Sequence, residues 1–330
     1  MPTVSVAALT ARAASLLSAA GAPDDVAQTT AEAIVGADVV GHESHGVAQL
    51  PGYLAAVKAG RIVPDARPHA IRETDTTALL DANKGFGHYS ATVAIDTAIA
   101  RARRTHLGAV SLANANHIGR LGHYAERAAA AGCIGIVSLG AGGTAGTTAP
   151  FGGTRGAMGS NPIAAAVPVV GDVPFVMDMA TSVFSNGKIG IARKLGRALP
   201  PGAILDKQGT PSTNPDDWAA GGPMLPAGGY KGYALSLLNL FTAALAMTGA
   251  PAGERIAGTF YLALDVTAFQ PLEEYAQRTA AYVRQLKEVP TQEGFDEILL
   301  PGERAARTAA QRRREGIPVP DDVWEALQAA

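Results

Sequence analysis

The sequence predicts an α/β protein with a helical region at its N-terminal end. The first observation is size, because 330 residues, 47% of them hydrophobic, are enough for more than one buried core. The second is that short apolar runs alternate with helix-like segments between residues 77 and 140. The third is that the first 60 residues contain only helix-like segments.

Three helices are expected in these first 60 residues. Apolar residues recur at helical spacing up to Gly21, and a second apolar face follows Asp24, which we interpret as an N-cap. A third helix is predicted over residues 51–58. The first 23 residues lack acidic side chains, but their helical spacing indicates an ordinary helix rather than a targeting peptide, so we expect a cytoplasmic protein.

The remaining elements follow from hydrophobic periodicity and from the glycines and prolines at their ends. Strands are predicted over residues 77–82, 107–114, 133–140, 163–170, 175–180 and 261–266. Helices are predicted over residues 90–104, 124–132, 231–249 and 271–289, with a further charged helical stretch from Gly302.

Composition excludes several classes of function. The net charge is −2 without a basic block, so neither nucleic acid nor an anionic membrane is expected as a partner. The single cysteine, Cys133, lies in an apolar run, which favours a buried side chain and excludes a disulfide framework or a zinc cluster. No run approaches the ~18 apolar residues that a membrane-spanning helix needs.

A glycine-rich segment follows the strand predicted at 133–140. Gly140, Gly142 and Ala145 have the G-x-G-x-x-G/A spacing of a dinucleotide-binding turn. Such a turn must open a helix, but residues 144–156 contain five glycines and prolines, and no acidic residue follows before Asp172. We therefore interpret the segment as a loop at a strand end and not as a Rossmann turn.

The sequence GHESHG at residues 41–46 places Ser44 and His45 in a short connection between helices. The spacing H-E-x-H does not put both imidazoles on one helix face, so it does not match a zinc protease. A serine hydroxyl can fix the tautomer of a neighbouring imidazole, and a loop histidine is suited to proton transfer near pH 7. A helix-capping serine beside a structural histidine explains the same residues.

Four further polar clusters lie at the ends of predicted elements. His117 follows a strand, and Gly119 beside it would permit the close approach of a ligand. Ser160 precedes another strand. Lys231 lies in the first turn of an apolar helix, where the dipole disfavours a cation, so a phosphate would fit there. The fourth cluster comprises Thr181, Ser182 and Lys188.

Together, the motifs SHG, NHIGRLGHYAE, GSNP, DMATS with NGK, GYKGYAL and LPGERA resemble the malate/L-lactate dehydrogenase family of the second type. Their order matches from Gly41 to the C-terminal helix. The resemblance implies a non-Rossmann NAD(P)-binding fold in which a helical N-terminal region packs with the C-terminal helices. It also implies a substrate-side domain of residues 1–115 with 296–330, and a cofactor-binding domain of residues 116–295.

The resemblance implies reversible NAD(P)H-dependent reduction of a 2-oxo acid by a homodimer whose active site lies near the interface, without a metal. His45 would donate the proton, Ser44 would orient it, and His117 would lie beside nicotinamide and substrate. Gln49 and Ser160 would face the substrate. The cofactor, with NAD(H) favoured over NADP(H), would contact His117 and a further set of residues: Asp178, Met179, Ala180, Thr181, Ser182, Asn186, Gly187, Lys231, Gly302, Glu303 and Arg304.

Two positions depart from the family pattern. Many relatives have an arginine, suited to a bidentate grip on a carboxylate, where this chain has Gln49. Imine-reducing members have a carboxylate where this chain has Lys188. A neutral amide at Gln49 would hold the substrate carboxylate less strongly, so another group is expected to hold it, while Lys188 favours hydroxy-acid chemistry over imine reduction. With NHIGRLG and SHGVAQLPGYL, both departures resemble the hydroxycarboxylate dehydrogenase B subgroup. A cyclic-imine (ketimine) reductase or N-alkyl amino acid dehydrogenase, and a non-catalytic cofactor-binding protein, are the alternatives.

Overall fold

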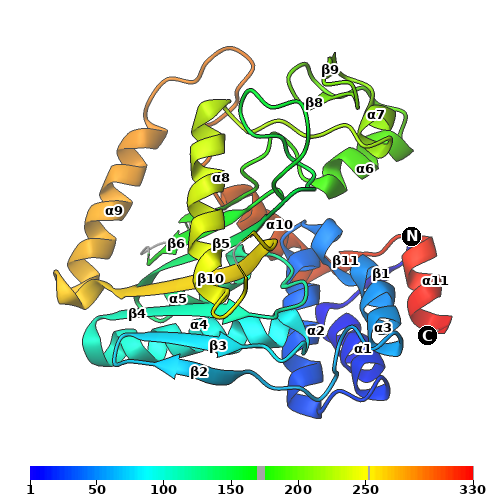
Figure 1. Cartoon of the computed structure of the whole chain (residues 1–330). Helices are drawn as coiled ribbons and strands as arrows, with labels where there is room; N and C mark the ends of the chain where they lie inside the picture. The colour runs from blue at the N-terminus through cyan, green and yellow to red at the C-terminus, as the bar shows by residue number, and fades with distance from the viewer. Residues whose placement is uncertain (169–174, 252, 330) are drawn as a thin grey trace. The chain divides into compact units, whose positions relative to one another are not determined.

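A computed structural model describes residues 1–168, 175–251 and 253–329 (Figure 1). It divides into two compact units. The first comprises residues 1–136, 164–178 and 261–330, and the second comprises residues 137–163 and 179–260. The predicted division into a substrate-side and a cofactor-binding domain stays a prediction.

A seven-stranded mixed sheet confirms the α/β class. Strand β2 is antiparallel to β3, and β3 is parallel to β4. In spatial order the strands are β2 (His69–Glu73), β3 (Thr77–Asp81), β4 (Leu107–Ala113), β10 (Ile256–Asp265), β5 (Cys133–Gly142), β6 (Ile163–Val167) and β7 (Phe175–Met179). Strand β2 was not predicted because all five of its residues are exposed, so it lacks the alternation that marks a half-buried strand.

The helices of the first unit largely follow the predicted segments. They are α1 (Val6–Ala19), α2 (Asp24–Val39), α3 (Leu50–Lys58), α4 (Gly87–Thr105), α5 (Gly122–Ala130), α9 (Leu272–Lys287), α10 (Glu303–Glu315) and α11 (Asp321–Ala329). The N-cap prediction was wrong by one residue. Pro23 is the N-cap of α2, and Asp24 lies in the first turn, where an acidic side chain interacts favourably with the helix dipole.

One apolar cluster joins the two ends of the chain. Leu17 and Ile34, from the N-terminal helices, belong to the same buried cluster as Ala309 in α10 and Leu327 in α11. Strand β1 (Thr3–Val4) pairs antiparallel with β11 (Ile317–Pro318) beside it. The expected packing of the helical N-terminal region with the C-terminal helices is thereby confirmed.

The second unit has shorter elements and a smaller core. It contains α6 (Asn186–Lys194), α7 (Pro215–Ala219), α8 (Tyr230–Ala243) and the paired strands β8 (Ile204–Leu205) and β9 (Pro211–Ser212). Helix α8 ends six residues before the predicted end at Gly249 and passes into a 3-10 turn over Ala244–Ala246. The strand predicted at 163–170 extends beyond residue 168, and residues 169 and 170 lie outside the described ranges.

The glycines of the dinucleotide-like segment serve packing. Gly140 and Gly142 belong to β5, which is longer than predicted, and turns rather than a helix follow at Ala145. A Cβ atom at Gly140 would lie 2.4 Å from the carbonyl oxygen of Asn239 in α8. Glycine is therefore required there by the close approach of α8 to β5.

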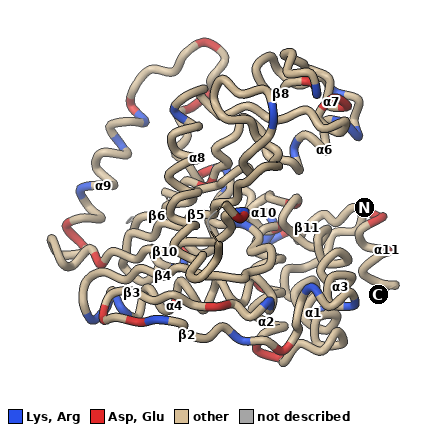
Figure 2. Tube along the Cα trace, viewed as in Figure 1, with Lys and Arg blue, Asp and Glu red and all other residues tan. Residues whose placement is uncertain are grey.

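Charges of both signs are interspersed along the chain (Figure 2). Cys133 is 1% exposed, as predicted. Within residues 1–168, 175–251 and 253–329, no helix combines the length and apolarity needed to cross a membrane.

Candidate active site

The turn after α2 presents the predicted Ser44–His45 pair. Residues Glu43–His45 form one turn of 3-10 helix. The Ser44 Oγ lies 3.0 Å from His45 Nδ1, a hydrogen bond that occupies this nitrogen in either tautomer. Among the described residues, His45 Nε2 has no hydrogen-bond partner, so it is the ring nitrogen available to a ligand.

His117 lies beside His45 although 72 positions separate them in the sequence. The two rings are stacked, with centroids 5.6 Å apart and planes 22° apart. The Tyr53 hydroxyl lies 2.6 Å from His117 Nδ1, and this hydrogen bond orients the ring. His88, on α4, meets the rings of Tyr53 and His117 edge-on, with centroid distances of 5.2 and 6.2 Å.

These imidazoles are held neutral at pH 7. Burial lowers the pKa of His45 below its usual value, partly opposed by Asp178 and reinforced by Arg120. Desolvation of the ring, and to a lesser extent the charge of the neighbouring His45, lower the pKa of His117 to about 4. Complete burial lowers the pKa of His88 well below its usual value.

A buried arginine follows His117 by three residues. The Arg120 side chain is 4% exposed, and its two terminal nitrogens donate to the Glu126 carboxylate at 2.9 and 2.8 Å. Its Nε lies 3.4 Å from Asp178 Oδ2, the same oxygen that accepts a hydrogen bond from the Gly122 N–H at 2.7 Å. Arg120 thus ties the loop that carries His117 to the end of β7.

The structure gives Gly119 a role in packing. A Cβ atom at Gly119 would lie 2.5 Å from His88 Nε2, and the backbone φ of 70° also favours glycine. The close approach of a ligand to Gly119 stays a prediction.

A family profile described as malate/L-lactate dehydrogenase matches residues 4–328. The chain belongs to this family. It is 34% identical to malate dehydrogenase of Pyrococcus abyssi, over 94% of this chain and 89% of the relative. It is 34% identical to L-sulfolactate dehydrogenase of Methanocaldococcus jannaschii, over 93% and 90%. With hydroxycarboxylate dehydrogenase B of Escherichia coli strain K12 it shares 29% identity, over 93% and 87%.

Solved structures agree with the family assignment. Sulfolactate dehydrogenase from Methanocaldococcus jannaschii superposes with a TM-score of 0.90 at 32% identity, covering 99% of this chain and 96% of that one. Delta1-piperideine-2-carboxylate reductase from Pseudomonas syringae pv. tomato superposes with a TM-score of 0.87 at 28% identity, covering 100% and 99%. The chain is thus a nicotinamide-dependent dehydrogenase for the reversible interconversion of small 2-oxo and 2-hydroxy acids.

The predicted site residues of this dehydrogenase fall into both units. Ser44, His45, Gln49, His117 and Asp178 belong to the first unit, which brings Ser44, His45 and His117 together. Gln49 is exposed, and its Nε2 donates to the Ser44 carbonyl oxygen at 3.0 Å.

Three C-terminal residues predicted to contact the cofactor also lie in the first unit. The backbone at Gly302 has a φ of 92° and packs against Val176, two residues before Asp178. Glu303 is 4% exposed and pairs with Lys287 and Arg307 at 2.7 Å each, so its carboxylate is already neutralised. Arg304 is exposed.

The second unit of the dehydrogenase holds the remaining predicted residues. The Ser160 carbonyl oxygen accepts hydrogen bonds at 2.9 Å from both the backbone N–H and the hydroxyl of Thr181. The Thr181 carbonyl oxygen in turn accepts from the Ala227 N–H at 2.9 Å, just before Lys231 on α8. The others are Met179, Ala180 and Ser182 beside Thr181, and Asn186 and Gly187 in the first turn of α6.

Sequence reasoning did not identify Tyr53, His88, Arg120 or Glu126 as site residues. Tyr53 lies in SHGVAQLPGYL and Arg120 in NHIGRLG, but neither residue was itself considered as a site residue. Two local signals were overlooked. Tyr53 is a polar aromatic residue one turn into the helix after His45, and Arg120 is a cation three residues after His117. The contacts themselves could not be predicted from a local pattern, because the partners of Tyr53 and Arg120, such as His117 and Asp178, are distant in the sequence.

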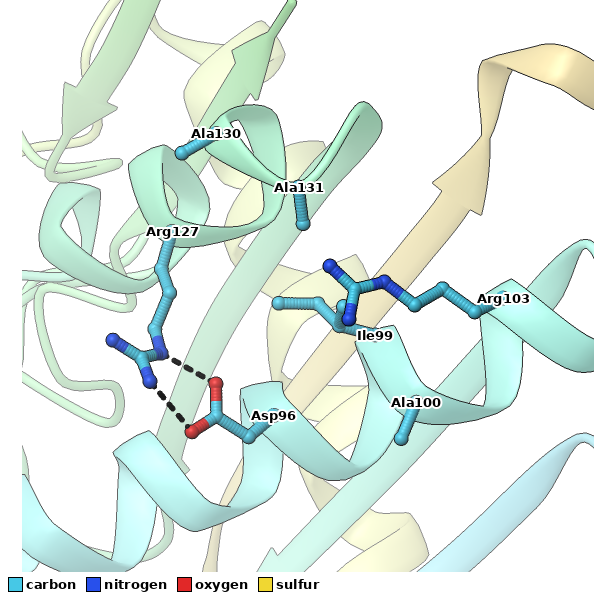
Figure 3. A pocket seen from close by; sticks show the side chains of 7 residues that line it. All are labelled: Asp96, Ile99, Ala100, Arg103, Arg127, Ala130 and Ala131. Carbon is cyan, nitrogen blue, oxygen red and sulfur yellow. Dashed lines mark hydrogen bonds and ion pairs between the residues drawn. The ribbon is translucent and has the colours of Figure 1, made fainter.

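A shallow cavity of 440 Å³ lies elsewhere in the dehydrogenase, between α4 and α5 (Figure 3). It is lined by Ile99, Arg103 and Ala131, and an ion pair between Asp96 and Arg127 lies at its edge. None of the predicted site residues lines it.

Replacing Arg120 with methionine should lower the free energy of unfolding by about 3–5 kcal/mol, because two carboxylates lose their buried partner. The matched control is Arg127→Met, which removes the half-exposed pair with Asp96 and should cost about 1 kcal/mol or less. Urea denaturation followed by circular dichroism measures both. Equal losses in the two variants would contradict the inferred role of burial.

Proposed function

We propose that this dehydrogenase reduces a 2-oxo acid by proton donation from His45. The observation that carries the proposal is the hydrogen bond between Ser44 Oγ and His45 Nδ1 beside the stacked ring of His117. Ser44 engages one ring nitrogen, so Nε2 faces the substrate and delivers the proton to its carbonyl oxygen as C2 gains hydride. In the reverse direction neutral His45 removes the hydroxyl proton.

His117 and Tyr53 complete the substrate side of the site in this proposal. Tyr53 fixes the orientation of His117 through Nδ1, which leaves Nε2 of His117 to contact substrate or nicotinamide. Because the pKa of His117 is about 4, this ring stays neutral while His45 changes its charge. The two histidines therefore have different roles. Ser160 and Gln49 are proposed to contact the substrate, and the substrate-side domain is proposed as residues 1–115 with 296–330.

The cofactor is proposed to be NAD(H), with NADP(H) as the alternative, held mainly by residues 116–295. The donor set fits a dinucleotide. Lys231 is exposed in the first turn of α8 and forms no ion pair within the described ranges, so a phosphate would neutralise it. Asn186 offers an exposed side-chain amide, whereas the buried Thr181 and Ser182 hydroxyls donate to the backbone carbonyls of Ser160 and Phe184. When bound, the cofactor supplies the hydride.

The remaining residues proposed to contact the cofactor are Asp178, Met179, Ala180, Gly187, Gly302, Glu303 and Arg304. We also propose a cytoplasmic homodimer whose active sites lie near the interface. Leu238, Phe241 and Leu245 on and just after α8 are 56–62% exposed, and exposed apolar side chains of this kind support association.

Cyclic-imine reduction is the second candidate function. The structural similarity to a piperideine-2-carboxylate reductase supports it. Lys188, where imine-reducing relatives have a carboxylate, argues against it. The resemblance to hydroxycarboxylate dehydrogenase B keeps 2-oxo acids as the preferred substrate class.

Purified protein should oxidise NADH, and NADPH more slowly, in the presence of a 2-oxo acid. The measurement is loss of nicotinamide absorbance with pyruvate, oxaloacetate, phenylpyruvate and piperideine-2-carboxylate, and with phenylpyruvate plus methylamine. Turnover restricted to the imine, or requiring the amine, would favour the second candidate. Absence of turnover with every 2-oxo acid would contradict the proposed reaction.

His45→Asn should reduce kcat by about 10²–10⁴-fold, the usual range for loss of an acid–base group, while NADH binding measured by fluorescence is retained. His106→Asn, at an exposed histidine, is the control. In the wild type, kcat/KM for reduction should fall as pH rises through the lowered pKa of His45, below 6.5, because reduction needs imidazolium. Oxidation should show the opposite slope. Near-normal turnover of His45→Asn would assign the proton to another group.

Gln49→Arg should lower KM for short 2-oxo acids about tenfold, since a charge-assisted hydrogen bond adds about 1.4 kcal/mol or more. The neighbouring exposed Ala48→Arg is the matched control, because it adds the same charge one position away. Steady-state kinetics with pyruvate measures both variants. An unchanged KM in Gln49→Arg would place Gln49 outside the substrate pocket.

A further inference from the structure

The turn that carries Ser44 and His45 is too short to hold its own shape. It has one turn of 3-10 helix, with backbone hydrogen bonds from His45 N–H to the His42 carbonyl at 2.9 Å and from Gly46 N–H to the Glu43 carbonyl at 3.1 Å. A 3-10 turn of this length has poor hydrogen-bond geometry. Groups outside the turn must therefore fix the direction of the His45 ring.

Asp38 contacts the turn from the last turn of α2. The residue is 3% exposed, and its Oδ2 accepts a hydrogen bond from the Val47 backbone N–H at 2.8 Å. A buried carboxylate needs such a donor, because an unpaired one is costly. The bond fixes the backbone two residues after His45.

Gly46 lies directly against the same carboxylate. A Cβ atom there would lie 1.9 Å from Asp38 Oδ1 and 2.4 Å from Oδ2. The backbone angles of Gly46, φ −90° and ψ −156°, are in the extended region open to any residue. Glycine is thus required by the close approach of Asp38 and not by its conformation.

Arg312 contacts the same turn from the C-terminal helix α10. One terminal nitrogen donates to the carbonyl oxygen of Asp38. Nη2 pairs with Glu43 Oε1 at 2.5 Å, and the Arg312 side chain is only 15% exposed. A single guanidinium thereby joins α2, the turn and α10, although it is 274 residues from Asp38 in the sequence.

We propose that Asp38 and Arg312 are positioning residues that clamp the Ser44–His45 turn from two sides and aim His45 at the substrate. The clamp consists of Asp38, Gly46, Glu43 and Arg312. It rests on the proposed function, because it acts through the proton transferred by His45. Neither Asp38 nor Arg312 touches the reacting atoms in this proposal.

The charges around Asp38 support a clamp that works with either form of the carboxyl group. The pKa of Asp38 is raised to about 7, mainly by burial; the hydrogen bond from the Val47 N–H opposes this rise, Glu43 adds to it, and Arg312 opposes it. The Val47 N–H has an oxygen acceptor in both protonation states. Asp38→Asn keeps that acceptor and should therefore lose less kcat than Asp38→Ala.

The first test is steric. Gly46→Ala should reduce kcat about tenfold or more, since a small misplacement of a catalytic group is expensive. The loss in the double variant Gly46→Ala/Asp38→Ala should be smaller than the sum of the two single losses, because Asp38→Ala removes the atoms that the new methyl group meets. Gly52→Ala on α3 is the control, since nothing lies within 4 Å of a Cβ there. Additive losses in the double variant would overturn the steric part of the clamp.

The second test removes the guanidinium group of Arg312 and does not require a substitution at the buried Gly46. Arg312→Met should lower kcat severalfold and shift the pH limb that belongs to His45, with NADH binding unchanged. Arg312→Lys should recover part of the loss. Arg313→Met, at an exposed position on the same helix, is the matched control.

Failure of the clamp and failure of the proposed function give different results. The clamp alone would be overturned by two results together. His45→Asn would have lost its turnover, and Arg312→Met would have the same kcat and pH profile as Arg313→Met. An active His45→Asn would overturn the proposed proton donor and the clamp with it. If Gly46→Ala does not fold, the kcat and pH profile of Arg312→Met decide the outcome.

Discussion

Arg120 carries a buried positive charge between two carboxylates, and the site of the first unit is arranged around it. Its guanidinium holds Glu126 on α5 and lies against Asp178 at the end of β7, while Asp178 also accepts from the backbone at Gly122. Removing one member leaves the others unpaired in a poorly solvated place. The loop between β4 and α5 is therefore fixed at its α5 end, and His117 is placed by that loop.

Burial has a second consequence for the chemistry. His45, His88 and His117 lie close enough that protonation of one disfavours protonation of the others, and desolvation acts in the same direction. Asp178 opposes this effect at His45 only. One imidazole of the group is thus better suited than its neighbours to take up a proton, which is what a reversible acid–base step on a hydroxy acid requires.

The second unit organises its polar groups differently. Backbone hydrogen bonds connect the segment at Ser160 to Thr181, and Thr181 to the loop before Lys231. Lys231 lies at the positive end of α8, and within the described residues its ammonium group has no counter-charge. Such an arrangement favours an anionic ligand, and it agrees with the need of this dehydrogenase family for a nicotinamide dinucleotide.

The sequence by itself determined the α/β class, most helices and strands, the absence of a helix over residues 144–156, and the family. Hydrophobic periodicity, glycines that end helices and short motifs involve only neighbouring residues, so they can be recognised from the sequence without a structure. The contacts of Tyr53 with His117, Arg120 with Asp178 and Asp38 with Arg312 were decided only by the tertiary structure. Their members are separated by 64, 58 and 274 positions, and packing of whole elements brings them together. Strand β2 and the requirement for glycine at position 46 were also decided only by the tertiary structure, because β2 is exposed and lacks the alternation of a half-buried strand, and Gly46 is required by its contact with Asp38.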